Sequence, residues 1–572
     1  MKTLLLILAI PLCVAAQAPA SSPLPATNEP TTGTITGKVV NEAGQPMPGA
    51  SAFVRAVNAS TSRTTITDSD GNFQVSGLEP ALYTIGASAP AYTTIPSDPN
   101  TPPVYYRIGD TARLELVRGG VITGMVTNAL GEPVIAVRVR AMLIRDAKGQ
   151  VVRDNFGGSE QSTDDRGIYR MFGLRPGTYL VSAGGFGGVQ TFQFNPYDSD
   201  VPTYAPSSTR DNAVEVSVRT GEESSVDIRY RAEPGYTISG TVKYSGTTGA
   251  SVTLTPVGNF LPAGNVFQAP ASRGFAFLGI ADGEYQVVAQ EIASATANPP
   301  VFSLSEVKTI TVKGASVGGI ELVTKPLASV SGKIALEHSK VPECQGKRPP
   351  LFQETVVQVR RPAKDAEKEN SPFMRIFGFS ATPDQNGAFV LRNIMPGRYQ
   401  FDPRFFARYW YLQSITIGGA AAAAGAKTQA AQTKTDAAAN WVSIKFGEQV
   451  SNLTVTIAEG AASIRGKLAS AEPAPGMSLY LVPSETDKAE DVLRFFVTEI
   501  AADGTFVLNN LPPGKYWALA QTNADAQTAT LLKLRLPETA PARIKLRKTA
   551  ETQKTEIELK PCQNVTDYKL KF

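Results

Sequence analysis

Five copies of one short pattern recur along the chain, and this repetition constrains the fold more than any other feature. The copies are DSDGNFQVSGLEPALYTI from Asp68, TDDRGIYRMFGLRPGTYLV from Thr163, ASRGFAFLGIADGEYQVV from Ala271, TPDQNGAFVLRNIMPGRYQF from Thr382 and AADGTFVLNNLPPGKYWAL from Ala501. In every copy an aromatic residue precedes a tyrosine by ten residues, with a large aliphatic residue midway. Such internal repetition signals one structural unit per copy. The sequence therefore predicts five similar units.

Each copy reads as two short strands joined by a turn, because apolar and polar residues alternate on both sides of a turn signal. We expect the aromatic residue, the aliphatic residue and the tyrosine to be buried, each stabilising its unit by roughly 1.5–3 kcal/mol. These hairpin core residues are Phe73, Leu78 and Tyr83; Tyr169, Leu174 and Tyr179; Phe275, Ile280 and Tyr285; Phe389, Ile394 and Tyr399; and Phe506, Leu511 and Tyr516. Gly71, Gly167, Gly387 and Gly504 precede the aromatic by two residues, where the turn is expected to need a positive φ.

A second motif lies upstream of each hairpin and reads as a first strand around a glycine. Its copies are GTITGKVV from Gly33, GVITGMVT from Gly120, YTISGTVK from Tyr236, ASVSGKIA from Ala328 and ASIRGKLA from Ala462. Further alternating runs follow each hairpin, including ARIKLR from Ala542 and TEIELK from Thr555, and no capped helix of comparable length is evident. We predict an all-β chain, a string of about five Ig-like or prealbumin-like antiparallel β-sandwiches with Greek-key connections.

The spacing of these motifs predicts the limits of the units. The β-sandwich units are expected at residues 33–118, 119–234, 235–326, 327–460 and 461–572. Within the fourth unit, residues 418–440 form an Ala-rich tract, for which a loop is favoured over a short helix. Residues 17–32 are rich in Pro, Ser and Thr and are expected to be a linker.

The first residues, MKTLLLILAIPLCVAAQ, combine one lysine, an apolar run and small residues. This pattern predicts a signal peptide over residues 1–16, cut after Ala16. The apolar run is too short to span a membrane, which takes about 20 residues. We therefore expect a secreted protein, located in the periplasm, at the cell surface or outside the cell, with no transmembrane segment in the mature chain.

Charge and cysteine content narrow the range of partners and crosslinks. The net charge is only +4 and forms no basic stripe, so nucleic acid is not an expected partner. Cys344 and Cys562 are the two cysteines left after cleavage. In an oxidising compartment they could form one disulfide between the fourth unit and the C-terminal segment, provided that their Cα atoms lie within bridging distance.

The first unit resembles the carboxypeptidase regulatory-like domains, which belong to the prealbumin-like class of sandwiches. The resemblance is carried by ITGKVVNEAGQPMPGASAFV and TTITDSDGNFQVSGLEPALYTIGASAPAY, and the second unit follows with ITGMVTNALGEPVIAVRV. Units three to five keep the strand glycine and the hairpin but lack the G-x-P-x-x-G-A turn. Similar sandwiches occur in Cna-B-type surface proteins and in starch-binding-like modules. The resemblance implies a fold, and for metallocarboxypeptidases a non-catalytic companion domain, but no activity.

The sequence offers no constellation of residues typical of an enzyme. A carboxypeptidase zinc site takes two histidines and a glutamate, whereas His338 is the one histidine of the chain. No nucleophile elbow surrounds a serine, and no phosphate-binding fingerprint stands between a strand and a helix. We therefore expect a non-enzymatic protein that has no catalytic or metal-binding residues and no cofactor.

Exposed aromatic residues are the strongest sign of a ligand, because a sugar ring stacks on an exposed aromatic face. The candidates for carbohydrate stacking are Tyr197 and Tyr204 in the second unit and Tyr409, Trp410 and Tyr411 in the fourth; Tyr105 and Tyr106 are also considered. Alternatively, these aromatics cover strand edges or the seams between units. The expected function is that of a structural spacer or an adhesion and interaction module, whose partner is another envelope protein or a polysaccharide. The alternative is a carbohydrate-binding protein.

Overall fold

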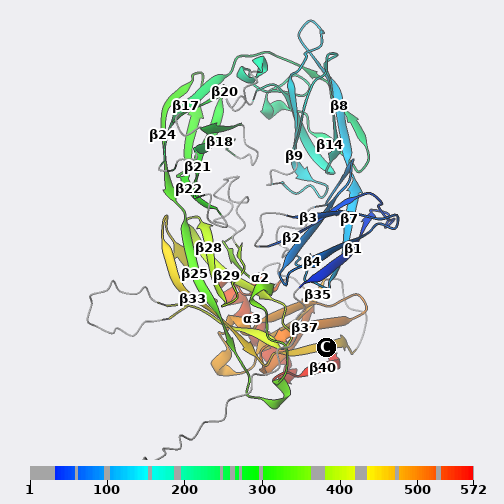
Figure 1. Cartoon of the computed structure of the whole chain (residues 1–572), viewed down its shortest axis with the longest axis vertical. Helices are drawn as coiled ribbons and strands as arrows, with labels where there is room; N and C mark the ends of the chain where they lie inside the picture. Colours follow the sequence, from blue (N-terminus) through cyan, green and yellow to red (C-terminus); the bar gives the residue numbers. More distant parts are fainter. Residues whose placement is uncertain are drawn as a thin grey trace, which may run out of the picture.

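The computed structural model describes residues 32–57, 62–95, 104–152, 158–185, 195–244, 246, 249–257, 264–268, 273–294, 300–362, 380–418, 434–469, 476–522 and 530–570. The expected signal peptide lies outside these residues, as do most of the linker and residues 419–433 of the Ala-rich tract. Strands dominate the described chain, so the all-β fold class is confirmed. The strands group into five sandwiches, which we name units 1 to 5 in chain order (Figure 1).

The first two units are sandwiches of two separate sheets. Unit 1 pairs a sheet of order β4-β1-β7-β6 with a sheet of order β3-β2-β5. Its strands are β1 (Gly33–Asn41), β2 (Ser51–Ala56), β3 (Arg63–Ile66), β4 (Asn72–Leu78), β5 (Tyr83–Ser88), β6 (Tyr92–Thr93) and β7 (Thr111–Arg118). Unit 2 contains β8 (Gly120–Thr127), β9 (Arg138–Asp146), β10 (Ser159–Ser162), β11 (Ile168–Leu174), β12 (Gly177–Ala183), β13 (Thr203–Tyr204), β14 (Val216–Val218), β15 (Glu223–Ser225) and β16 (Ile228–Arg229).

In unit 3 the two sheets join into one path of strands, because β22 pairs with β24. Its strands are β17 (Tyr236–Lys243), β18 (Ala250–Pro256), β19 (Gly264–Gln268), β20 (Gly274–Ile280), β21 (Gly283–Ser294), β22 (Val301–Ser305), β23 (Lys308–Val312) and β24 (Val317–Pro326).

Units 4 and 5 return to two separate sheets. Unit 4 contains β25 (Ala328–Glu337), β26 (Thr355–Arg360), β27 (Ser380–Ala381), β28 (Ala388–Ile394), β29 (Gly397–Phe405), β30 (Trp410–Ile417), β31 (Thr435–Asp436), β32 (Val442–Ile444) and β33 (Gln449–Glu459). Unit 5 contains β34 (Ala462–Leu468), β35 (Met477–Pro483), β36 (Phe496–Glu499), β37 (Thr505–Leu511), β38 (Gly514–Thr522), β39 (Glu556–Leu559) and β40 (Asn564–Leu570), with helices α2 (Leu531–Leu534) and α3 (Ala540–Gln553).

The first strand of every unit lies between the first hairpin strand and a strand near the end of the unit. In unit 1, β1 pairs antiparallel with β4 and parallel with β7. The same arrangement recurs around β8, β17, β25 and β34. Each unit therefore contains at least one parallel pair, which departs from the wholly antiparallel sheets that the sequence predicted.

All fifteen hairpin core residues are buried, as the sequence predicted, with between 0% and 7% of each residue exposed. The five tyrosines share one further contact: each hydroxyl donates to the backbone carbonyl four residues earlier. The oxygen–oxygen distances are 2.7 Å for Tyr83, 2.8 Å for Tyr179, 2.9 Å for Tyr285, 2.8 Å for Tyr399 and 2.8 Å for Tyr516. This bond closes the second turn of the hairpin, in the manner of the tyrosine corner of immunoglobulin-like sandwiches.

The glycine in the middle of each first strand lies directly opposite the hairpin aromatic. The register pairs Gly37 with Phe73, and the other four units repeat this pair. A Cβ at Gly37 would lie 2.4 Å from the Phe73 ring and 2.6 Å from the Ala112 carbonyl oxygen. Glycine is therefore needed here, because the aromatic ring and the neighbouring parallel strand occupy the space of a side chain.

Each hairpin contains a bulge that was not predicted from the sequence. The residue before the midway aliphatic has a positive φ in every unit, and the pairing with the first strand shifts at the same point. These bulge residues are Gly77, Gly173, Gly279, Asn393 and Asn510. Glycine and asparagine are the residues that adopt this conformation at low cost, so the pattern was available in the sequence.

One predicted strand is wrong. Residues 542–547 (ARIKLR) belong to helix α3, which covers β35 and β38 of unit 5. Arg543, Leu546 and Ala550 are its buried residues, and their spacing of three and four is helical. Over six residues the alternation imitated a strand, whereas the good helix formers that follow and Pro541 in the first turn favour a helix.

Burial of the hairpin tyrosines predicts a loss of stability in alkali. Desolvation raises the pKa of Tyr285 to about 12, and it raises the pKa of Tyr83, Tyr179 and Tyr516 as well. In an unfolded chain these groups ionise near pH 10. The folded state therefore holds its protons more tightly, and its stability is complete below pH 10 and falls as the pH rises toward 12 and beyond.

The measurement is a pH titration that follows tyrosinate absorbance and circular dichroism together. We expect the buried tyrosines to ionise in step with unfolding. Ionisation of every tyrosine near pH 10 in a protein that stays folded would contradict this expectation.

Candidate functional site

The hairpin bulges of units 3, 4 and 5 lie where the preceding unit docks. The Asn393 amide donates to the Pro300 carbonyl at 2.9 Å and accepts from the Phe302 amide at 2.9 Å, which joins units 3 and 4. The Asn510 amide donates to the carbonyls of Ala407 and Trp410 at 2.8 Å and 2.7 Å, which joins units 4 and 5. The hairpin therefore builds the core of its own unit and also fixes the unit before it.

At the junction of units 2 and 3 the bulge residue is Gly279. A Cβ there would lie 2.5 Å from the Asp200 carbonyl oxygen and 2.7 Å from that of Asp198. At the junction of units 1 and 2, the Gly119 amide donates to the Ala91 carbonyl at 2.8 Å. At both junctions, backbone atoms of one unit therefore lie in close contact with backbone atoms of the next.

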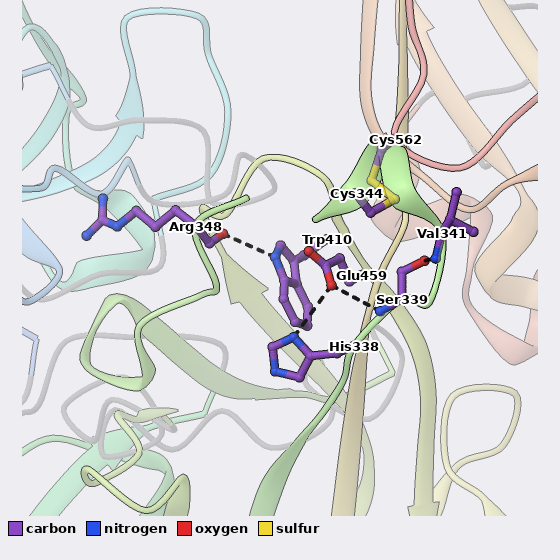
Figure 2. The surroundings of a disulfide bond; sticks show 8 residues. All are labelled: His338, Ser339, Val341, Cys344, Arg348, Trp410, Glu459 and Cys562. Atoms are coloured by element: carbon purple, nitrogen blue, oxygen red, sulfur yellow. Dashed lines mark hydrogen bonds and ion pairs between the residues drawn. A yellow bond between two sulfur atoms is a disulfide. The ribbon is translucent and has the colours of Figure 1, made fainter. Parts of the chain in front are cut away.

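The loop between β25 and β26, residues 338–354, is a hub that connects unit 4 to units 1 and 5; we call it the hub loop. Its Cys344 is joined to Cys562 of unit 5 by a disulfide, with 5.4 Å between the Cα atoms (Figure 2). Cys344 is fully buried. The bridge considered from the cysteine count is therefore present, and it links segments 218 residues apart.

Trp410 is buried and contacts the hub loop rather than facing solvent. Its indole Nε1 donates to the Arg348 carbonyl at 3.1 Å, and its ring meets the His338 ring edge-on at 5.1 Å (Figure 2). The Glu459 carboxylate accepts from the Ser339 amide at 3.0 Å and lies 3.5 Å from His338 Nδ1. Together these contacts hold the segment that carries Cys344.

The C-terminal end of the hub loop, at Glu354, contacts unit 1. The Glu354 carboxylate is buried and lies 3.8 Å from Arg107 of unit 1 and 3.7 Å from Arg348. The Arg107 guanidinium also lies over the Phe406 ring, 5.4 Å from its centre. A second contact joins the same two units: the side-chain amide of Gln358 in β26 donates to the Tyr105 hydroxyl. Burial raises the pKa of Tyr105. Tyr105 thus covers a seam between units, the alternative considered above.

These contacts close the string of units into a circuit. In Figure 1 the chain passes from unit 1 (blue) through units 2 and 3 and back to units 4 and 5, beside which unit 1 lies. The repeated motifs predict the number of units but not the contact between units 1 and 4. Arg107 and Glu354 lie in separate loops that share no sequence pattern.

The predicted carbohydrate platform is wrong for two of its five residues. Trp410 is 0% exposed and Tyr204 is 7% exposed, so neither ring face is open to a sugar. The other three are partly exposed: Tyr197 packs edge-on against Tyr230 at 5.5 Å, and the Tyr409 ring faces the Lys347 ammonium at 4.8 Å. Burial raises the pKa of Tyr411. Side chains alternate between the two faces of β30, and the fully buried member of the run is the tryptophan.

The described residues contain neither a cluster of metal ligands nor a membrane-spanning helix. In that part of the chain, no group of three or more His, Cys, Asp or Glu side chains is placed to hold a metal ion. No helix there is long and apolar enough to cross a membrane.

The contact between units 1 and 4 predicts the effect of Arg107→Ala. The substitution removes a partly buried ion pair and a cation–π contact, which should weaken the closure by about 1–2 kcal/mol. We expect a larger radius of gyration in X-ray scattering and a Tyr105 pKa that falls back toward about 10. Arg113→Ala, at an exposed position of β7 in the same unit, is the matched control and should change neither quantity. Unchanged scattering and an unchanged Tyr105 pKa in Arg107→Ala would contradict the closure.

Comparison with known proteins bears on unit 1 most directly. Residues 34–116 match the model of the carboxypeptidase regulatory-like domain family, so the resemblance of the first repeat is confirmed. No curated protein matches the chain.

Several solved structures show local similarity. The TIE protein of Bacillus anthracis is 15% identical over 52% of this chain and 51% of its own, with a TM-score of 0.14. This chain thus spans about half the length of that protein. A minor pilin of Streptococcus agalactiae is 11% identical over 35% of this chain and 96% of its own, with a TM-score of 0.18. The shaft pilin SpaA of Lactobacillus rhamnosus GG is 12% identical over 35% and 98%, with a TM-score of 0.17. These scores are too low to support an argument about function.

Proposed function

We propose that the protein is a non-catalytic interaction scaffold of the cell envelope, exported by the signal peptide at residues 1–16. The observation that carries the proposal is the set of junctions between units: each of units 2 to 5 contacts the unit before it, and the hub loop connects unit 4 to units 1 and 5. A chain that serves only as a flexible spacer needs no such contacts. Fixed junctions hold the outer surfaces of five sandwiches in one arrangement, as a scaffold requires.

The disulfide supports export. Disulfides form and persist outside the cytoplasm, in the periplasm or beyond. The proposed domain limits are residues 33–118, 119–234, 235–326, 327–460 and 461–572, and the mature chain is proposed to begin at Gln17. N-terminal sequencing of the protein recovered from the periplasm or the medium tests this start. Recovery of the uncut chain from the cytoplasm would contradict export.

A protein partner is favoured over a polysaccharide, because Trp410 and Tyr204 are buried and do not form the sugar platform. The test is co-sedimentation of the purified mature chain with cell envelopes of its source organism. We expect saturable binding that disappears when the envelopes are treated with protease and persists after treatment with glycosidases. Binding lost only after glycosidase treatment would favour the carbohydrate alternative, and absence of any binding would contradict the scaffold.

A further inference from the structure

A cavity of about 410 Å³ lies between β29 of unit 4 and the part of unit 5 around α2. The residues considered for sugar stacking do not line it, and neither does the hub loop. Its walls come from two units that the disulfide and Asn510 hold together, so the cavity belongs to a fixed junction.

The polar part of the cavity wall is cationic. Arg360, Arg404 and Arg535 line it together with a single carboxylate, that of Asp402. The Asp402 Oδ2 atom accepts from Nε and one terminal nitrogen of Arg360, at 3.1 Å and 3.0 Å. The same atom accepts two bonds from Arg404, both at 3.0 Å. Three guanidinium groups and one carboxylate are the charged groups of the wall, so the wall carries a net charge of +2.

Arg535 is the least satisfied of these three cations. One terminal nitrogen donates to the Leu493 carbonyl at 3.3 Å, and the guanidinium lies over the Phe496 ring, 5.1 Å from its centre. Its Nε is shielded from solvent and has no hydrogen-bond partner among the described residues. Burial lowers the pKa of Arg535 to about 10, so the side chain is still a cation at neutral pH. A largely buried cation of this kind is stabilised by an anion beside the guanidinium.

The remaining wall is mainly apolar. It includes Phe405, Leu412, Phe496, Leu508 and Leu531, contributed by both units. Asp491, which is not part of the wall, acts on Arg535 electrostatically and also forms an ion pair with Arg494 at 3.6 Å. The cavity thus combines a cationic end with an apolar body, and it has the size of a small-molecule site.

We propose that this cavity binds a carboxylate carried on an apolar or aromatic body. The carboxylate pairs with the Arg535 guanidinium, whose planar fork matches two carboxylate oxygens, and the apolar body packs against the leucine and phenylalanine side chains. Two sources supply this chemistry: a free aromatic acid, and the C-terminal residue of an apolar peptide. The cavity lies in the junction of units 4 and 5 and Asn510 is part of its wall, so this proposal rests on that junction. Binding of an acid to the purified protein and binding of the protein to cell envelopes are measured separately, so the failure of one proposal can be told from the failure of the other.

The test is calorimetric titration of the mature protein with 3-phenylpropionate and with its neutral amide. We expect the acid to bind and the amide to bind at least tenfold more weakly, because the amide lacks the charge that pairs with arginine. Acetyl-Gly-Phe and its C-terminal amide form the second arm. Tighter binding of the peptide acid than of 3-phenylpropionate identifies a peptide C-terminus as the source, and the reverse order identifies a small acid.

Variants test whether the acid binds in the cavity or elsewhere on the surface. Arg535→Gln should weaken binding of the acid at least tenfold, whereas Arg113→Gln, at an exposed position of unit 1, should leave it within twofold. If Arg535→Gln does not fold, Leu531→Trp decides, because the larger side chain fills the cavity from its unit 5 wall and should abolish binding. The proposal is overturned if neither acid binds, if acid and amide bind equally, or if the folded cavity variants bind as the wild type does.

Discussion

Replacing Gly124 with alanine is expected to destabilise unit 2 by about 3 kcal/mol, because no space exists for the added methyl group. A Cβ at Gly124 would lie 1.9 Å from the Val226 carbonyl oxygen and 2.6 Å from the Val226 carbonyl carbon. Both are backbone atoms of the neighbouring segment, so they cannot move aside as a flexible side chain would. The measurement is hydrogen exchange of peptides from β8 and β11, which should exchange far faster in the variant.

Gly158→Ala provides the matched control in the same unit. A Cβ at Gly158 would lie 3.6 Å from the Ala141 carbonyl oxygen, which is ordinary contact, and the residue does not have a positive φ. We expect a change within about 0.5 kcal/mol. Equal exchange in the two variants would show that packing does not require the glycine of the first strand, contrary to its close contacts with the aromatic ring and the parallel strand.

Removing the disulfide is expected to have the second large effect. The double variant Cys344→Ala, Cys562→Ala should lose roughly 2–5 kcal/mol at the junction of units 4 and 5, because the bridge no longer restricts the unfolded chain. The linked residues are 218 positions apart, which places this bridge among the long loops for which the expected effect is largest. Differential scanning calorimetry should show an earlier transition for units 4 and 5 and unchanged transitions for the others.

Reduction of the wild-type protein is the control for the two substitutions, since it breaks the bridge without changing side-chain volume. It should lower the same transition by a similar amount. Identical calorimetric traces for oxidised, reduced and substituted protein would mean that Asn510 and the packing of the two units hold the junction without the disulfide.

Local patterns in the sequence predicted the interior of each unit well. The ten-residue spacing of aromatic and tyrosine placed Phe389 and Tyr399 in the core of unit 4, and the strand glycine stood opposite the aromatic. Alternation reports which face of a strand is buried, and this holds whatever the units do to one another. The same rule failed at residues 542–547, where a short alternating run belongs to helix α3 of unit 5.

The junctions could be predicted only in part. Asn393 and Asn510 occupy the position of Gly77, Gly173 and Gly279, and a comparison of the five copies could have marked that position as a bulge with positive φ. The contacts of Arg107 with Glu354 and of Arg360 with Asp402 had no such signal, since they depend on how distant loops and strands approach each other. Trp410 shows the same limit: it is buried in the core of unit 4 and its indole also bonds to the hub loop.

The central claim is that the five units form a closed arrangement in which unit 1 rests on unit 4. The most direct test replaces Tyr105 with the photoreactive residue p-benzoylphenylalanine and identifies the crosslinked peptides by mass spectrometry. The Tyr105 hydroxyl contacts Gln358, so we predict crosslinks within one chain to the peptide of β26, and fewer of them when Arg107→Ala is added. Crosslinks only between different chains, or none to unit 4 under efficient photolysis, would contradict the closed arrangement.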